Sequence, residues 1–496
     1  MNASKQTDAI NRLAEIRANA GERQTLGISD GRISELIALE PELEKAIYIA
    51  HDRFTSLSDE ERRLFENAES ALIKLLQDGY LNFYPQEAIN PYVPLAAKGP
   101  WLVTTHGAIV LDCGGYGMLG AGHAPDAVLE KMAKPFVMAN IMTASLSQER
   151  FLKRLKRHLG FKRGHCPFDR FLCLNSGSES VTVASRISDA NAKRQTAKDG
   201  PHSGKKTIFM ALKGAFHGRT DRPAQVSDSS LPKYRKHLLS FTGRDNLIIV
   251  EPNNPEALRA AYAQAEKDGL FIEALFMEPI QGEGNPGVAI EREFYDMARE
   301  LTLSHGSMLI VDSIQAGIRG QGCLSIVDYP GFEDCAVPDM ETWSKALNGG
   351  QYPLSVLGMS TRAAAAYQRG LYGNTMTTNP RALEVACTIL DGLTPEIRAN
   401  IVDQGKQFLD RLNSVCADYP HIASHAQGTG LLFAIELHEK YSVTAAGGIE
   451  EQCRKQGLGI IHGGKNAIRF TPVFTTTNTQ VDLTISILRD VFDRLS

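Results

Sequence analysis

Short apolar runs alternate with helical stretches between about residues 170 and 360. The helical stretches, such as SESVTVASRISDANAKR, carry apolar residues three and four positions apart. The apolar runs have the length of buried strands, and they are FLCLN, KTIFMAL, NLIIVEP, ALFMEPI, SMLIVD and LSVLGMS. This alternation predicts an α/β domain built on a mostly parallel sheet. Because such sheets bind ligands beyond the carboxyl ends of their strands, the residues that follow each run are the first candidates for chemistry.

The two ends of the chain follow other patterns. Residues 1–95 are polar with apolar residues at helical spacing, as in SLSDEERRLFENAESALIKLLQDGY, where Ser58 or Asp59 can cap a helix. Beyond residue 380, helical segments precede short strand candidates such as LLFAIEL and AIRFTPV. We therefore expect a helical extension (1–95), a small α+β domain in two parts (96–150 and 379–496) and a large domain (151–378).

Composition narrows the class of protein. The 496 residues carry a net charge of −4, which argues against a nucleic-acid or anionic-membrane partner. The amino-terminal residues lack the apolar core of a signal peptide, and no run approaches the roughly 18 apolar residues of a membrane span. Eight scattered cysteines contain no C-x-x-C pair, so we expect reduced thiols, no metal site and a cytoplasmic location.

Two glycine-rich segments superficially resemble nucleotide-binding loops. The segment GYGMLG at 115–120 has the glycine spacing of a dinucleotide fingerprint, but Asn140 stands where an acidic residue is expected. Residues 200–207 resemble a P-loop that is one residue short and has Lys206 in place of Ser or Thr. A glycine-rich turn and a basic loop before a strand are the better interpretations.

Other residues that follow the apolar runs suit a phosphorylated, planar cofactor. The segment NSGSE at 175–179 opens a helix, and a helix amino terminus attracts phosphate through free N–H groups and the macrodipole. Phe216 and His217 lie in a loop where an aromatic side chain could stack on a ring. Taken singly, these features also fit an ordinary capped helix and a core aromatic residue.

Asp312 and Lys345 provide the reactive groups of this hypothesis. Asp312 ends the run LIVD, and a buried acid at a strand end needs a partner. A protonated pyridinium nitrogen is such a partner. Lys345 precedes the next run, on the same face of the sheet, and a lysine of lowered pKa can form an imine with an aldehyde cofactor. By themselves, the two residues could equally be a capping acid and a solvated surface lysine.

Seven segments in this order resemble the class III aminotransferases, which are pyridoxal 5′-phosphate (PLP) enzymes of fold type I. They are NSGSES, FHGRT, EPIQGEG, LIVDSIQAG, SKALNGG, NTMTTNP and IRFTP, and the resemblance extends over about residues 95–475. It implies a large domain with a mostly parallel, seven-stranded type of sheet, flanked by helices, beside a smaller α+β domain. It also implies transfer of an amino group from an ω-amine or amino acid donor, ornithine among the candidates, to an α-keto acid such as 2-oxoglutarate.

The resemblance assigns roles to the residues that bind the cofactor. Lys345 matches the lysine that holds PLP as a Schiff base, and Asp312 matches the acid at the pyridinium nitrogen. The remaining cofactor contacts match Gly177 and Ser178 in the phosphate turn, Phe216 and His217 at the ring, Gln315 near the ring hydroxyl and Thr375 at a phosphate. In the family this threonine reaches the cofactor of the neighbouring subunit, which implies a homodimer with shared active sites.

Three further matches concern the substrate. Arg469 matches the arginine that binds the α-carboxylate, and its planar fork suits two carboxylate oxygens. Glu283 matches a gating glutamate that pairs with this arginine in ω-aminotransferases. Tyr116 matches a tyrosine of ornithine aminotransferases that contacts the α-carboxylate of the donor, although it could also simply line the dimer interface.

The sequence departs from the family pattern in places. Ser313 follows Asp312 where the family usually has a glutamate that supports the cofactor region, and Arg319 lies one position earlier than its usual counterpart. Two threonines in NTMTTN at 374–379 replace commoner glycines. A racemase or epimerase of the same family, or a non-catalytic protein of the same fold, is therefore an alternative that the sequence leaves open.

Overall fold

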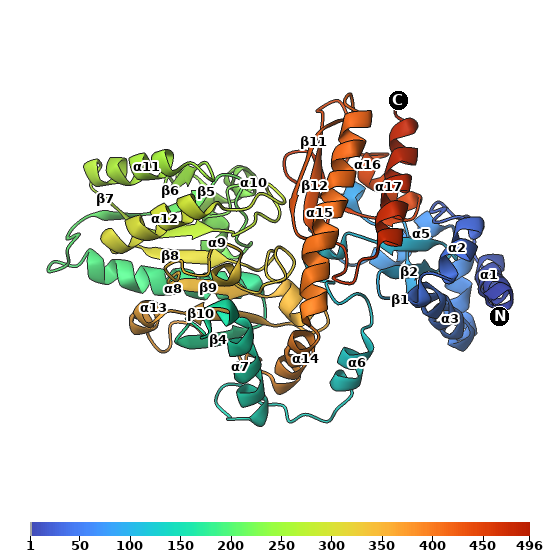
Figure 1. The fold of residues 1–496 in the computed structure, drawn as a ribbon, viewed down its shortest axis with the longest axis horizontal. Coiled ribbons are helices and arrows are strands. Elements are labelled where there is room, and N and C mark those ends of the chain that lie inside the picture. Colours follow the sequence, from blue (N-terminus) through green and yellow to red (C-terminus); the bar gives the residue numbers. More distant parts are fainter. Residues whose placement is uncertain (1) are drawn as a thin grey trace. The chain divides into compact units, whose positions relative to one another are not determined.

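The computed structural model describes residues 2–496, with side chains from residue 5 onward; the first residue of the predicted 1–95 extension lies outside the described part. The chain forms two compact units. The central unit comprises residues 127–402 and 428–432, and the terminal unit comprises residues 1–126, 403–427 and 433–496. Figure 1 shows the elements of both units in sequence colours.

The central unit is built on a seven-stranded sheet with the order β4-β10-β9-β8-β7-β5-β6. Its strands are β4 (Arg170–Leu174), β5 (Lys206–Leu212), β6 (Leu247–Val250), β7 (Leu270–Met277), β8 (Met308–Asp312), β9 (Met340–Trp343) and β10 (Ser355–Met359). Neighbouring strands from β6 to β9 are parallel, and β10 is antiparallel to both β9 and β4. The predicted α/β class and mostly parallel sheet are thus confirmed.

Helices flank this sheet, as its composition requires (Figure 1). Strands β8, β9 and β10 are buried along their whole length, so both faces of the sheet must be covered. The helices of the unit are α6 (Asp126–Met132), α7 (Leu146–His158), α8 (Gly177–Gln195), α9 (Asp221–Gln225), α10 (Leu231–His237), α11 (Pro255–Lys267), α12 (Arg292–Ser304), α13 (Thr361–Ala366) and α14 (Pro380–Asp391). Helix α8 packs against strands β4 and β7–β10, while α11 and α12 pack against each other and against β6–β8.

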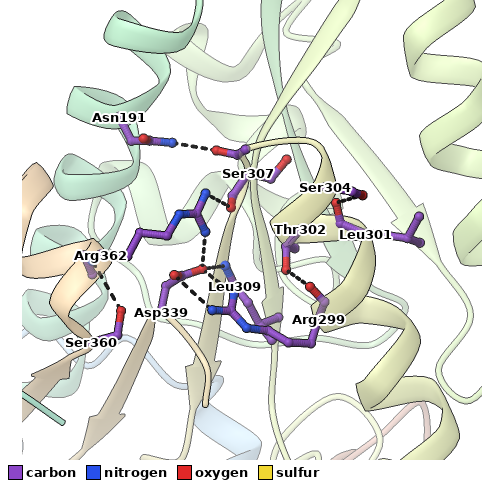
Figure 2. Close-up of polar contacts among 12 residues, drawn as sticks. Asn191, Arg299, Leu301, Thr302, Ser304, Ser307, Leu309, Asp339, Ser360 and Arg362 are labelled. Atoms are coloured by element: carbon purple, nitrogen blue, oxygen red, sulfur yellow. Dashed lines mark hydrogen bonds and ion pairs between the residues drawn. The ribbon is translucent and has the colours of Figure 1, made fainter. Parts of the chain in front are cut away.

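The amino ends of β8 and β9 are held by an amino-edge hub, which we define as Asp339, Arg299 and Arg362 (Figure 2). Asp339 Oδ2 accepts hydrogen bonds from Arg299 Nη1 at 2.7 Å and Arg362 Nη1 at 2.9 Å. The same oxygen accepts from the Leu309 N–H at 2.9 Å, and Arg362 Nη2 donates to the Ser307 carbonyl at 2.8 Å. The hub therefore ties two strand starts to helices α12 and α13.

The terminal unit contains two four-stranded sheets and most of the remaining helices. The first sheet has the order β1-β2-β3-β13, from β1 (Pro94–Lys98), β2 (Trp101–Thr104), β3 (Ile109–Asp112) and β13 (Leu458–Gly459). The second has the order β11-β12-β15-β14, from β11 (Ala423–Thr429), β12 (Leu432–Leu437), β14 (Ile461–Gly463) and β15 (Ala467–Phe470). Helices α16 (Ile449–Lys455) and α17 (Asn478–Asp493) belong to this unit, and α15 (Pro395–Asp418) runs from the central into the terminal unit.

The amino-terminal segment is helical in short pieces. Its helices are α1 (Asn2–Ala18), α2 (Asp30–Ile37), α3 (Pro41–Ser56), α4 (Asp59–Arg63) and α5 (Glu69–Gln77). Ser58 caps α4 through a reciprocal capping box with Glu61. Among the described residues, no helix has the length and apolar character needed to cross a membrane.

The two nucleotide-loop look-alikes have plain structural roles. The segment at 115–120 follows β3, which pairs with β2 in antiparallel fashion, rather than opening a βαβ unit. A Cβ at Gly120 would lie 2.2 Å from the Phe474 ring, so this glycine is required by packing. Residues 200–205 form the turn that leads into β5.

Candidate active site

Asp312 ends β8 at the carboxyl edge of the central sheet and is 3% exposed. Its Oδ2 accepts a hydrogen bond from His217 Nδ1 at 2.9 Å. Its Oδ1 accepts from the Ile314 N–H at 3.1 Å and from Thr342 Oγ1 at 3.3 Å. A strand end, a loop and the neighbouring strand thus fix the orientation of this buried carboxylate.

His217 lies in the loop after β5 and is held from two sides. Its backbone N–H donates to Ser227 Oγ at 2.9 Å, and its ring Nδ1 contacts Asp312 as described. Its Nε2 is buried and has no hydrogen-bond partner within the part of the chain that the structure describes. Burying a polar atom without a hydrogen-bond partner costs free energy unless a ligand or a water binds to it. The buried Nε2 therefore indicates that a ligand or a water binds here.

The amino terminus of α8 lies against the loops that carry His217 and Asp312. Ser176 caps the helix, which leaves Gly177 and Ser178 in the first turn, where backbone N–H groups have no partner within the helix. A Cβ at Gly177 would lie 2.7 Å from Ile314 Cδ1, and one at Gly218 would lie 2.3 Å from Ser178 Oγ. These close approaches require glycine and bring a phosphate-binding helix end to the same edge of the sheet.

Gln315 and Phe216 lie beside the loop that follows β7. A Cβ at Gly282 would lie 2.4 Å from Gln315 Cδ, so the buried Gln315 side chain packs directly on this loop. Glu283 in the same loop forms an ion pair with Arg219 at 3.3 Å. The Arg219 guanidinium in turn lies 5.2 Å from the centre of the half-buried Phe216 ring. The pairing of Glu283 with Arg469 stays a prediction, because these residues belong to different units.

Lys345 follows β9 by two positions and is half-buried. Thr342 lies opposite Asp312 in the β8–β9 ladder, so Lys345 and Asp312 come from paired strands at the same edge of the sheet. The turn that presents the lysine is held by Ser344 Oγ and Asn348 Nδ2, which donate to the Leu354 carbonyl at 2.7 and 2.8 Å. Lys345 itself has a φ of 20°, outside the usual range for a residue with a side chain.

Thr375 lies near the amino terminus of α8 in the same chain. The adjacent Asn374 donates to Glu179 Oε1 at 2.7 Å and accepts from Asn175 Nδ2 at 3.1 Å. The Thr375 carbonyl accepts from Asn140 Nδ2 at 3.0 Å, and the residue is exposed. A contact of Thr375 with the cofactor of a neighbouring subunit stays a prediction.

Glu278 is a second buried carboxyl group at this edge of the sheet. Its Oε1 accepts from the Phe216 N–H at 3.0 Å and its Oε2 from the Gly282 N–H at 2.8 Å. The pKa of Glu278 is raised to about 7. Burial is the main cause and Asp312 adds to it, while His217 and the two N–H groups act in the opposite direction. The Glu278 side chain joins the loop of Phe216 to the loop of Glu283.

Tyr116 and Arg469 belong to the terminal unit. Tyr116 follows β3 with a φ of 49° and is 42% exposed. It lines two cavities of about 270 and 160 Å³ within this unit. Arg469 lies on β15, opposite Ala434 of β12, and is 4% exposed. The structure therefore places two of the three substrate candidates, Tyr116 and Arg469, in the terminal unit, and Glu283 and the cofactor candidates in the central unit.

The residues of the central unit fit PLP. A helix amino terminus suits its phosphate, a buried carboxylate suits its ring nitrogen and a lysine amine suits its aldehyde. Gly177 and Ser178, Asp312 and Lys345 provide these three groups at one edge of the sheet. The buried Nε2 of His217 adds a polar atom that faces no protein partner within the described residues.

Sequence reasoning missed several supporting residues. Thr342 and Ser227 position Asp312 and His217, yet each is an ordinary hydroxyl residue in the sequence. Their roles depend on strand register and loop conformation. Glu278 did leave a signal, because it directly follows the apolar run of β7, as Asp312 ends the run of β8.

Comparisons with known proteins agree with this geometry. A family model described as Aminotransferase class-III matches residues 83–492. The acetylornithine aminotransferase of Neisseria meningitidis serogroup B is 30% identical over 396 residues, covering 78% of this chain and 91% of that protein. The acetylornithine aminotransferase of Nostoc sp. is 29% identical over 331 residues, covering 65% of this chain and 72% of that protein.

A solved structure shows the same fold. The ornithine aminotransferase from Toxoplasma gondii ME49 superimposes with a TM-score of 0.71 at 22% identity, covering 90% of this chain and 98% of that chain. The chain therefore belongs to the class-III aminotransferase family and is a PLP-dependent transaminase of fold type I.

Proposed function

We propose that this transaminase takes its amino group from the terminal amine of an ω-amino acid of the ornithine or acetylornithine type. The acceptor is an α-keto acid such as 2-oxoglutarate. The observation that carries the proposal is the convergence of Lys345, Asp312 and the amino terminus of α8 at one edge of the central sheet. The names of the similar proteins, acetylornithine and ornithine aminotransferase, support the donor class.

The residues of the central unit have separate tasks in this reaction. When bound, PLP supplies a ring that accepts electrons from the substrate carbon. Lys345 Nζ would hold the cofactor aldehyde in the resting enzyme and, as a free amine, would move a proton at the substrate carbon. Asp312 keeps the ring nitrogen protonated, and the hydrogen bond from His217 fixes the carboxylate for that task. Gly177 and Ser178 hold the phosphate at the first turn of α8.

Arg469 and Tyr116 of the terminal unit and Glu283 of the central unit select the substrate in this proposal. Arg469 binds the α-carboxylate of the keto acid, and Glu283 covers this arginine when the terminal amine of the donor is to react. Tyr116 contacts the donor carboxylate.

Gln315 and Phe216 hold the ring of the cofactor, and Thr375 reaches the phosphate in the second subunit of a homodimer. The eight cysteines are free thiols, which supports a cytoplasmic location.

Racemisation is the second reaction that this site could support. It would use Lys345 and Asp312 in the same way, but the proton would return to the opposite face of the same substrate carbon and the amino group would stay on that carbon. The relatives that match the chain are named as aminotransferases, which does not favour this alternative.

A donor panel tests the proposal. The purified protein with PLP is mixed with 2-oxoglutarate and with N-acetylornithine, ornithine, lysine, 4-aminobutyrate or alanine, and glutamate is measured. We expect glutamate from donors with a terminal amine, and none without 2-oxoglutarate. Loss of donor chirality in the absence of any keto acid would contradict transamination, and activity with alanine alone would contradict the donor class. Lys345→Ala provides the matched inactive control.

A further inference from the structure

Glu341 is a third buried carboxyl group of the central sheet, and the reaction as described does not use it. It lies on β9, opposite Val311 of β8, and it is fully buried. The next residue on its strand is Thr342, which donates to Asp312. The carboxyl group therefore lies one strand away from the acid that serves the cofactor ring.

The hydrogen bonds of Glu341 go to both ends of one loop. Its Oε1 accepts from Ser313 Oγ at 2.5 Å and from the Ile326 N–H at 3.1 Å. Its Oε2 accepts from Ser325 Oγ at 2.5 Å. All three donors are uncharged, whereas Asp339 at the other end of β9 meets two guanidinium groups. One side chain thus closes the segment from 313 to 326, which we call the 313–326 loop.

The 313–326 loop begins directly after Asp312 and carries Gln315. The Ser313 N–H donates to the Thr342 carbonyl at 3.0 Å, so the first residue of the loop continues the β8–β9 ladder. A shift of Ser313 would therefore move the Ile314 N–H group that donates to Asp312. It would also displace Gln315 relative to Gly282, on which it packs. The loop connects Glu341 mechanically to the two side chains that face the cofactor ring.

Position 313 is also where this sequence departs from the family pattern. A serine stands where a glutamate is usual, and its hydroxyl donates to the carboxyl group of Glu341. The chain thus has a carboxyl group in contact with position 313, but it comes from the neighbouring strand.

We propose that Glu341 is a positioning residue for the cofactor site. Its carboxyl group closes the 313–326 loop, holds Asp312 and Gln315 in place, and substitutes for the carboxylate that position 313 lacks. The inference assumes the cofactor site at Lys345, and the visible absorbance of the PLP-loaded parent protein establishes that site independently. It does not depend on which amine is the donor.

The first test compares Glu341→Leu with Glu341→Gln. Leucine leaves the hydroxyls of Ser313 and Ser325 and the Ile326 N–H without an acceptor, so we expect the Kd for PLP to rise at least about tenfold. Glutamine can still accept from Ser313 and Ile326 and donate to Ser325, so we expect a rise of no more than about threefold. The Kd is measured by equilibrium dialysis of the folded apoprotein, together with the pH midpoint of the visible band of the bound cofactor.

The control is Asp339→Asn, which disturbs the other end of β9. A general loss of stability would affect both ends, whereas loss of positioning affects only the cofactor. We expect Asp339→Asn to lower the melting temperature and leave the Kd for PLP within about twofold, below the change that one hydrogen bond gives. An unchanged Kd and an unchanged band in Glu341→Leu would overturn the proposal, as would an equal loss in the Gln and Leu variants.

A second set of variants decides the matter if Glu341→Leu does not fold. Ser313→Ala and Ser325→Ala each remove one donor from one end of the loop, and we expect each to raise the Kd for PLP about threefold. The exchange Ser313→Glu with Glu341→Ser returns the carboxyl group to position 313, and we expect it to bind PLP more tightly than Glu341→Ser alone. No change in either alanine variant, or no recovery in the exchange, would contradict the positioning role.

Discussion

Strands β8 and β9 carry a buried aspartate at each end, and the two ends differ in how that charge is met. At the amino edge, Asp339 accepts hydrogen bonds from two guanidinium groups and a backbone N–H (Figure 2). At the carboxyl edge, Asp312 accepts from one imidazole, one hydroxyl and one backbone N–H. The same two strands thus place a carboxylate with two guanidinium partners at one end, and a carboxylate bound by an imidazole, a hydroxyl and a backbone N–H at the other.

The difference separates a structural ion cluster from a binding site. Two arginines on one aspartate satisfy a buried charge within the protein, and removing a partner is strongly destabilising. A carboxylate held by neutral or titratable groups remains able to interact with a further positive charge, such as a protonated ring nitrogen. The carboxyl edge also holds Glu278 and Glu341, both buried, and the positive φ of Lys345. Three buried carboxyl groups and an unfavourable backbone conformation of a lysine thus lie at this edge.

The largest expected effect at the carboxyl edge comes from Lys345→Ala. Turnover should fall at least about 10³-fold, because Lys345 is the residue proposed to move the proton at the substrate carbon. Glutamate formation with 2-oxoglutarate measures this loss. Lys213→Ala, at the carboxyl end of β5 and on the surface, is the matched control and should retain parent activity. Full turnover by Lys345→Ala would remove the basis for the assignment.

Asp312→Asn should have the next largest effect. Asparagine keeps an oxygen for the Ile314 N–H and Thr342 but cannot keep the ring nitrogen protonated, so kcat should fall about 10³-fold. The melting temperature of the apoprotein should change little. A variant that loses stability and keeps kcat would place Asp312 in the same class as Asp339.

Asp339→Asn should show the opposite result. It leaves the buried guanidinium of Arg299 and the half-buried guanidinium of Arg362 without their charge partner, which should lower the free energy of unfolding by about 3 kcal/mol. The kcat of the folded fraction should stay within about twofold, because the hub lies at the other end of the strands. Urea unfolding and active-site titration measure the two quantities. Loss of kcat without loss of stability would mean that Asp339 serves the reaction rather than the fold, and the contrast between the two edges would be wrong.

The strand pattern was sufficient to predict most of the central sheet. The six apolar runs became β4, β5, β6, β7, β8 and β10. Strand β9 was missed because its four residues include Glu341 and Thr342, and polar residues in a buried strand do not resemble an apolar run. These two residues are polar because they serve the 313–326 loop and Asp312. The strand that the apolar pattern missed is therefore the one whose polar side chains contact the 313–326 loop and Asp312.

The site itself was predictable only in part. The cofactor, the enzyme class and the fold were predicted through the resemblance and are confirmed. The contacts of His217 with Asp312 and of Gln315 with Gly282 depend on how the segments that follow β5, β7 and β8 meet, which no local pattern encodes. The roles of Tyr116, Glu283, Arg469 and Thr375 stay predictions.

Glu278→Gln tests the unusual protonation of this edge. Burial holds the pKa of Glu278 at about 7 in the folded protein, against 4.5 when unfolded. The folded state therefore binds more protons between these values, so stability should decrease as the pH rises from 4.5 to 7. The free energy of unfolding of the parent should therefore be lower at pH 7.5 than at pH 5 by a contribution on the order of 1–3 kcal/mol, which glutamine removes. Parallel pH dependences of urea unfolding in apo parent and variant would contradict the assignment.

Tyr116→Phe should have the smallest effect. It removes one hydroxyl from the terminal unit and none from the central unit, so kcat should be unchanged. The KM of the donor should rise about threefold if the hydroxyl contacts the donor carboxylate. A donor KM that does not change would indicate that Tyr116 has only a packing role.

The most direct test of the account is to fix the cofactor chemically to the lysine that holds it. The PLP-loaded protein is reduced with borohydride, digested, and examined by mass spectrometry for a peptide that carries the pyridoxyl group. The account predicts the label on Lys345 and its absence from Lys213 and Lys205. A label on any other lysine, or loaded protein that yields no labelled peptide, would contradict it.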